Sequence, residues 1–120
     1  MKVVGLHHVQ LAMPERREDE ARAFYADILG FDEETKPEIL QGRGGVWFRA
    51  GPLRLHLGVE MPFVPARKAH PGIEVENLDA AKAHLDSMGH SWSQDVDISD
   101  IRRIYVADPF GNRIEILETR

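Results

Sequence analysis

Hydrophobic and polar positions alternate along eight short stretches of this chain. Such alternation predicts β-strands, because successive side chains of a strand point to opposite faces of the sheet. The predicted strands are Val3–Met13, Phe31–Lys36, Val46–Ala50, Leu53–Val59, His70–Val75, Ser93–Asp97, Arg103–Ala107 and Asn112–Glu118.

Two further stretches carry apolar residues at the spacing of one helix face. The first helix is predicted over Glu15–Leu29. Its first half is rich in acidic residues, which are favourable near the positive N-terminal end of a helix. The second is predicted over Leu78–Met88, with Asn77 as its N-cap. Gly30 and Gly89 follow the two helices directly, where glycine commonly ends a helix.

The order of one strand, one helix and three strands therefore occurs twice. The repetition predicts an α+β fold of two tandem βαβββ modules in a single domain covering residues 1–120. Module 1 spans 1–59, a proline-containing linker spans 60–69, and module 2 spans 70–120. Neither module can bury both faces of its own sheet, so we expect mixed sheets curled around a cleft with the helices outside.

Four side chains that commonly bind metals occupy corresponding places in the two halves. His56 and Glu115 lie in the matched tetrapeptides Arg54–Leu57 and Arg113–Ile116, and His8 and His70 lie in the first strand of each half. By strand alternation all four point away from the aliphatic residues that belong under the helices. We therefore expect His8, His56, His70 and Glu115 to share the concave face.

Composition excludes several classes of protein. The net charge of −5 argues against a nucleic-acid binder, and the absence of cysteine excludes disulfides and thiolate metal sites. No apolar run approaches the roughly 18 residues that a membrane span needs, and the N-terminal stretch resembles no signal peptide. A cytoplasmic protein that contacts neither membrane nor nucleic acid is expected. The paired basic residues are interpreted as solvated surface; they are Arg16, Arg17, Arg67, Lys68, Arg102 and Arg103.

Three neutral imidazoles and one carboxylate around a divalent cation leave a net charge of +1, which attracts an anionic oxygen pair of a small substrate. The metal would act as a Lewis acid and template. Nitrogen and oxygen ligands suit Zn, Fe, Mn, Ni or Co without choosing among them. Glu115 is the first candidate for the catalytic base and His56 the second. Several residues are candidates for the pocket wall: Gln10, Trp47, Arg49, Phe63, Trp92 and Tyr105.

The chain resembles the vicinal oxygen chelate superfamily, also called the glyoxalase, bleomycin-resistance and dioxygenase group. The segments that carry the resemblance are His8–Leu11, Phe24–Phe31, Leu55–Leu57, His70–Val75 and Asp108–Glu115. The family's metal positions fall here on His8, His56, His70 and Glu115. The resemblance implies a metal-dependent lyase or isomerase of the glyoxalase kind, and a homodimer.

Two alternatives follow from the same resemblance. Glyoxalase I members have a glutamate where this chain has His56, which argues against strict lactoylglutathione lyase activity. Extradiol dioxygenases and fosfomycin-modifying thiol transferases use two histidines and a carboxylate, a set that His8, His70 and Glu115 would supply. Bleomycin-resistance proteins bind a drug without metal, and the acidic charge of this chain would suit a cationic ligand.

Overall fold

A computed structural model describes residues 1–120, which divide into two units, Met1–Val64 and Pro65–Arg120. The division falls within the stretch predicted to link two modules. Unit 1 contains β1 (Val9–Met13), α1 (Glu18–Arg22), η1 (Ala23–Ile28), β2 (Asp32–Glu34), η2 (Glu38–Arg43), β3 (Val46–Ala50) and β4 (Leu53–Val59). Unit 2 contains β5 (Gly72–Glu74), α2 (Leu78–Ser87), β6 (Ser93–Gln94), β7 (Ile101–Ala107) and β8 (Arg113–Thr119).

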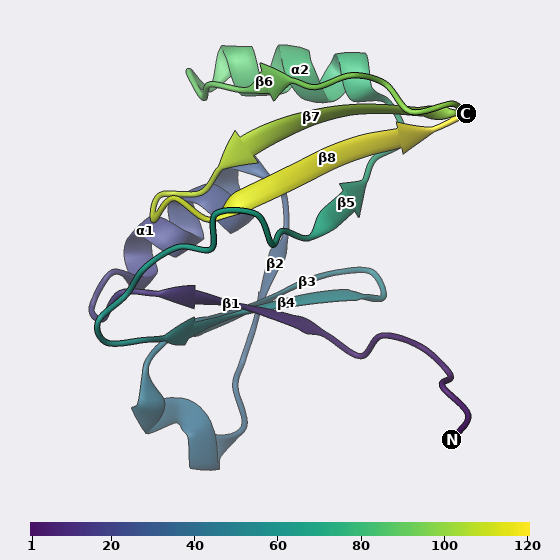
Figure 1. The fold of residues 1–120 in the computed structure, drawn as a ribbon. Helices are drawn as coiled ribbons and strands as arrows, with labels where there is room; N and C mark the ends of the chain where they lie inside the picture. The colour runs from purple at the N-terminus through teal and green to yellow at the C-terminus, as the bar shows by residue number, and fades with distance from the viewer. The chain divides into compact units, whose positions relative to one another are not determined.

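Each unit is built around a four-stranded mixed sheet, and the two sheets have the same topology (Figure 1). The strand order is β1-β4-β3-β2 in unit 1 and β5-β8-β7-β6 in unit 2. The first and last strands of each unit pair in parallel, and the other pairs are antiparallel. The prediction of a repeated βαβββ fold with mixed sheets is confirmed.

The helix of each unit packs on the aliphatic face of its sheet. In unit 1 the ring of Tyr25 from η1 stacks on Phe48 of β3, with ring centroids 5.3 Å apart. In unit 2 α2 packs against β8, and Leu78 and Leu85 are its buried residues. The alternation in β4 and β8 thus buries leucine and isoleucine under a helix and turns the intervening residues to the opposite face.

Both helices end as predicted, but the first begins later. Gly30 and Gly89 have φ values of +82° and +68°, a conformation that glycine adopts without steric cost. The side chain of Asn77 accepts a hydrogen bond from the backbone N–H of Ala80 and caps α2. The first helix begins at Glu18 instead of Glu15, and its second part, η1, is a π-helix.

The first predicted strand is the main error in the secondary structure. The strand begins at Val9, not at Val3, and residues 1–8 are exposed. Val9 pairs with Leu55 of β4 in parallel, and β4 itself begins only two residues earlier, at Leu53. Most of the segment before Val9 therefore lies beyond the start of its partner strand. None of the helices is long and apolar enough to span a membrane.

Candidate functional site

The strand register makes His56 and Glu115 structurally equivalent. His56 of β4 pairs with Gln10 and Trp47, and Glu115 of β8 pairs with Gly72 and Tyr105. Each residue thus lies between the first and third strands of its sheet, on the face away from the helix. His8 and His70 each precede their sheet's first strand by one or two residues. The residues that correspond in the repeated sequence therefore also occupy corresponding positions in the two sheets.

His56 is a buried histidine in a stack of rings. Its side chain is 3% exposed, and its ring lies parallel to Trp47 at 3.8 Å and stacks on His8 at 4.4 Å. The Nε2 atom of His56 is buried without a hydrogen-bond partner. Burial lowers the pKa of His56, and the neighbouring His8 lowers it further, which favours the neutral imidazole. Neutral imidazole is the form that binds metal ions.

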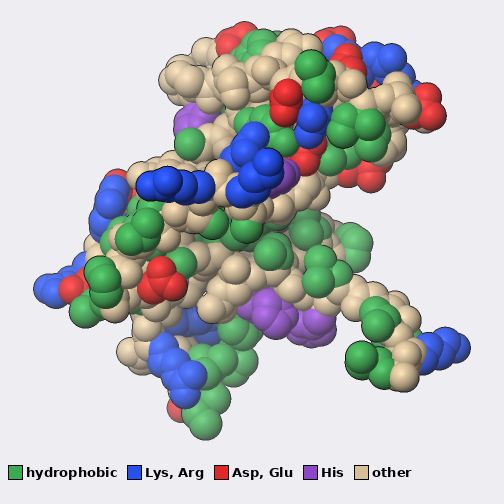
Figure 2. All heavy atoms as spheres, viewed as in Figure 1, with side chains coloured by type: hydrophobic (Ala, Val, Ile, Leu, Met, Phe, Trp, Pro, Cys, Tyr) green, Lys and Arg blue, Asp and Glu red, His purple; other side chains and the backbone are tan.

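His8 is also linked to the surface of unit 1. Its Nδ1 lies 2.9 Å from Nδ1 of His7, and Nε2 of His7 lies 3.0 Å from the guanidinium of Arg54. Figure 2 shows histidine side chains gathered on the surface beside this sheet. Because Arg54 can only donate, His7 accepts at Nε2 and donates from Nδ1 to His8. His7 precedes β1, which begins at Val9, and its side chain lies at the surface.

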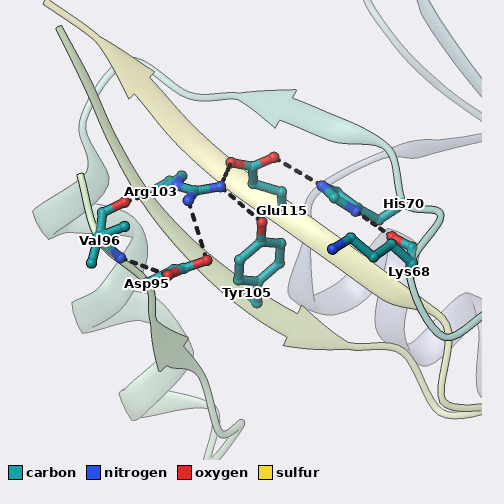
Figure 3. A network of polar contacts seen from close by, with 7 residues as sticks. All are labelled: Lys68, His70, Asp95, Val96, Arg103, Tyr105 and Glu115. Atoms are coloured by element: carbon teal, nitrogen blue, oxygen red, sulfur yellow. Dashed lines mark hydrogen bonds and ion pairs between the residues drawn. The ribbon is translucent and has the colours of Figure 1, made fainter. Parts of the chain in front are cut away.

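In unit 2 His70 and Glu115 are in direct contact (Figure 3). The Nδ1 atom of His70 lies 2.8 Å from the carbonyl oxygen of Lys68, so Nδ1 carries a proton. The Nε2 atom of His70 lies 3.1 Å from Oε2 of Glu115. In neutral His70 this places a nitrogen lone pair against a carboxylate oxygen. A cation between the two atoms, either a proton or a metal ion, turns this repulsion into attraction.

Arg103 holds the other oxygen of Glu115. Its guanidinium donates to Glu115 Oε1 at 3.3 Å, to the Tyr105 hydroxyl at 2.9 Å, to Asp95 at 3.2 Å and to the Val96 carbonyl at 3.0 Å (Figure 3). Desolvation opposes the charge, but the hydrogen bond to Glu115 and the attraction of nearby acidic groups outweigh it and raise the pKa of Arg103. Glu115 therefore has a fixed cation on one side.

Arg103 was interpreted from the sequence as solvated surface, and that interpretation is wrong. The Arg103 side chain is 14% exposed and lies on the face of Glu115, whereas Arg102 lies on the helix face and pairs with Asp79 at 2.7 Å. Alternation along β7 was the available signal, because Arg103 and Tyr105 have the same parity. Among the other pocket candidates, Gln10, Trp47, Tyr105 and Trp92 line pockets. Arg49 instead lies exposed on the β3–β4 hairpin.

The structure contains no group of three or more histidine or acidic side chains arranged to hold a metal ion. The donor types themselves suit a divalent metal, because imidazole nitrogens and carboxylate oxygens are common metal ligands. Within unit 1, His8 stacks on His56, whose Nε2 has no partner, and within unit 2, His70 contacts Glu115. His70 also has the outer contact typical of a metal-bound histidine, with its second nitrogen donating to a backbone carbonyl.

Comparison with known proteins agrees with this architecture. A solved structure from Bacillus anthracis, described as a glyoxalase family protein, is 45% identical, covers 100% of this chain and 98% of its own, and superposes with a TM-score of 0.96. The antibiotic-binding protein TnmS3 from Streptomyces sp. CB03234 is 20% identical, with 99% and 100% of the two chains covered and a TM-score of 0.75. A glyoxalase/dioxygenase from Nostoc punctiforme is 23% identical, with 97% and 91% covered and a TM-score of 0.77.

At these lower identities the last two structures show the fold alone. No curated protein matches the chain. A family profile matches residues 5–116, which is nearly the whole sequence and includes both copies of the repeat. This chain therefore belongs to the Glyoxalase/Bleomycin resistance protein/Dioxygenase superfamily.

Proposed function

We propose that the protein is a glyoxalase-like enzyme that uses a divalent metal ion to act on a small, oxygen-rich substrate. His8, His56, His70 and Glu115 are the proposed ligands. The observation that carries the proposal is the buried Nε2 of His56, which has no partner in the protein. An unsatisfied buried polar atom costs about 1–3 kcal/mol, and such a cost is typical of a functional position.

The contact between His70 and Glu115 supports the same proposal. Its geometry needs a cation between a nitrogen lone pair and a carboxylate, and a metal ion meets that need as well as a proton does. Zn, Fe, Mn, Ni and Co all accept this ligand set.

When bound, the metal would supply Lewis-acid polarisation of two substrate oxygens. Glu115 is the proposed base that takes a proton from the substrate carbon and returns it to a neighbouring atom. Arg103 fixes Oε1 of Glu115, and the other oxygen, Oε2, faces His70. Trp47 holds the ring of His56 flat, and this stacking favours His56 as a ligand over His56 as a mobile base.

Metal analysis of protein purified without a histidine tag tests this proposal. We expect a stoichiometric metal ion in the wild type and loss of most of it in His56→Ala and in Glu115→Gln. His90→Ala is the matched control, because His90 is a half-buried histidine that already bonds the carbonyl of Ala107. Absence of metal from every preparation, or equal metal content in all variants, would refute a metal site at these residues.

Metal-free binding of a small molecule is the second candidate function. The observation that favours it is a pocket in unit 2 whose walls include Trp92 and Tyr105. Binding that is unchanged after chelation of all metal, in protein that shows no turnover, would favour this alternative.

A further inference from the structure

The pocket in unit 2 has a volume of about 590 Å³ and lies beside Glu115 on the same sheet. Tyr105, which pairs with Glu115 across β7 and β8, forms part of its wall. Arg113 and Ala107 pair with each other and share the parity of Tyr105, so they extend the same face toward the β7–β8 turn. The pocket and the contacts of Glu115 thus meet at Tyr105.

The charge of this pocket is opposite to that of the chain. Arg67 and Arg113 are its only charged lining residues, and no carboxylate lines it. Neither arginine forms an ion pair or a conventional hydrogen bond, whereas Arg102 and Arg103 of the same unit are both paired. In a chain of net charge −5, two unpaired guanidinium groups around one cavity create a local positive potential.

The remaining walls are mostly aromatic and apolar, and Ser91 and Ser93 are the uncharged polar residues among them. The guanidinium of Arg113 lies 3.9 Å from the ring centroid of Tyr105, which holds it over the wall of the pocket. The indole of Trp92 is fixed by its hydrogen bond to Asp86 at 2.9 Å. Pro65 adds an apolar surface. Side chains held in this way lose little freedom when a ligand binds.

We propose that this pocket binds the anionic end of a small molecule with a flat, apolar body, with Arg113 and Arg67 as the residues that select the anion. Guanidinium groups pair with carboxylate, phosphonate or sulfonate oxygens in a two-pronged geometry, and the ring of Trp92 offers a surface for the body. The identification of the bound molecule as the substrate rests on the proposed function. The binding of an anion by the pocket is independent of that function. A cationic ligand, which the overall acidity would suit, is disfavoured at this place.

Calorimetric titration with naphthalene-2-carboxylate tests the proposal, and naphthalene-2-carboxamide serves as an uncharged probe of the same shape. In chelator-treated wild-type protein we expect the carboxylate to bind at least about tenfold more tightly than the carboxamide. Arg113→Gln and Arg67→Gln should each reduce this ratio. Arg113→Lys should retain part of it, because the charge remains. Arg16→Gln is the control, since Arg16 lies exposed in unit 1 and pairs only with Glu15.

Equal affinity for the two probes, no binding of either at millimolar concentration, or an undiminished ratio in both glutamine variants would overturn the proposal. Arg67 is exposed and makes no contact that holds the fold, so Arg67→Gln remains informative if Arg113→Gln fails to fold. The outcome is independent of the metal site. Preference for the carboxylate probe, with no metal in any preparation, would refute the proposed function and support the anion site. A bound metal without preference for the carboxylate probe would support the proposed function and refute the anion site.

Discussion

Replacement of His56 by phenylalanine should stabilise the protein when no metal is present. The imidazole is buried with Nε2 unpartnered, so it carries an uncompensated desolvation cost of about 1–3 kcal/mol. A phenyl ring has no polar atom to desolvate and can keep the parallel stack on Trp47. We therefore expect the free energy of unfolding of the chelator-treated, metal-free protein to rise by about 1–3 kcal/mol. At this chain length each kcal/mol corresponds to about 3–6 °C in Tm.

The sign should reverse when metal is added. A free ion at 1,000 times its dissociation constant stabilises the wild type by about 4.1 kcal/mol, which exceeds the gain of the variant, and the variant should lose most of that increment. Thermal and urea denaturation with chelator and with Zn²⁺, Mn²⁺ or Ni²⁺ would measure both effects. His90→Phe is the control: the Nε2 of His90 is hydrogen-bonded, so its replacement should not stabilise. A metal-free His56→Phe protein that is less stable than the wild type by more than about 1 kcal/mol would refute the reasoning.

Three other predictions concern the backbone, the support of Glu115 and acid stability. Gly45→Ala should destabilise the protein by about 3 kcal/mol in urea denaturation, because φ is +81° and the added Cβ would lie 2.2 Å from a carbonyl oxygen of β4. Gly51→Ala, with φ at +57° and open space around it, should cost only about 1 kcal/mol, and equal costs would contradict this account. Arg103→Gln should weaken metal affinity about 10–100-fold in competition with a chelator, whereas Arg102→Gln, on the opposite face, should leave it unchanged. The hydrogen bond from Arg102 lowers the pKa of Asp79, so this pair stabilises the fold above the ordinary Asp pKa of 3.8 and is lost as the pH falls through the lowered value. Asp79→Asn should therefore be less stable than the wild type near neutral pH, and the difference should vanish in strong acid; a difference that persists there would exclude the ion pair as its cause.

The sequence predicted the sheets well because the decisive signals are local. Alternation in Leu53–Val59 identifies both the strand and the direction of His56, since one residue fixes the face of its neighbours. The cap at Asn77 and the glycine after each helix are equally local. His56 and Glu115 could therefore be assigned to the face away from the helix without knowledge of any long-range contact, whereas His8 and His70 precede the first strand of their sheets.

The parts that the sequence did not predict depend on contacts between distant positions. Alternation along β7 places Arg103 on the same face as Tyr105, but no spacing along the chain indicates that Arg103 also contacts Asp95 and Glu115. The start of β1 at Val9 is set by where β4 begins, not by the composition of Val3–His8. The donation from Arg54 to His7 likewise joins residues 47 positions apart.

The alternation in β4 and β8 has a consequence for how this chain can change over evolutionary time. Leu55, Leu57, Ile114 and Ile116 are buried and support the helices, while His56 and Glu115 occupy the intervening positions. The positions that support the fold and the positions proposed for chemistry are therefore separate, and they alternate one by one along each strand. Substitutions at the intervening positions can therefore accumulate over evolution while the buried scaffold remains intact, which is how one architecture can come to serve unrelated tasks.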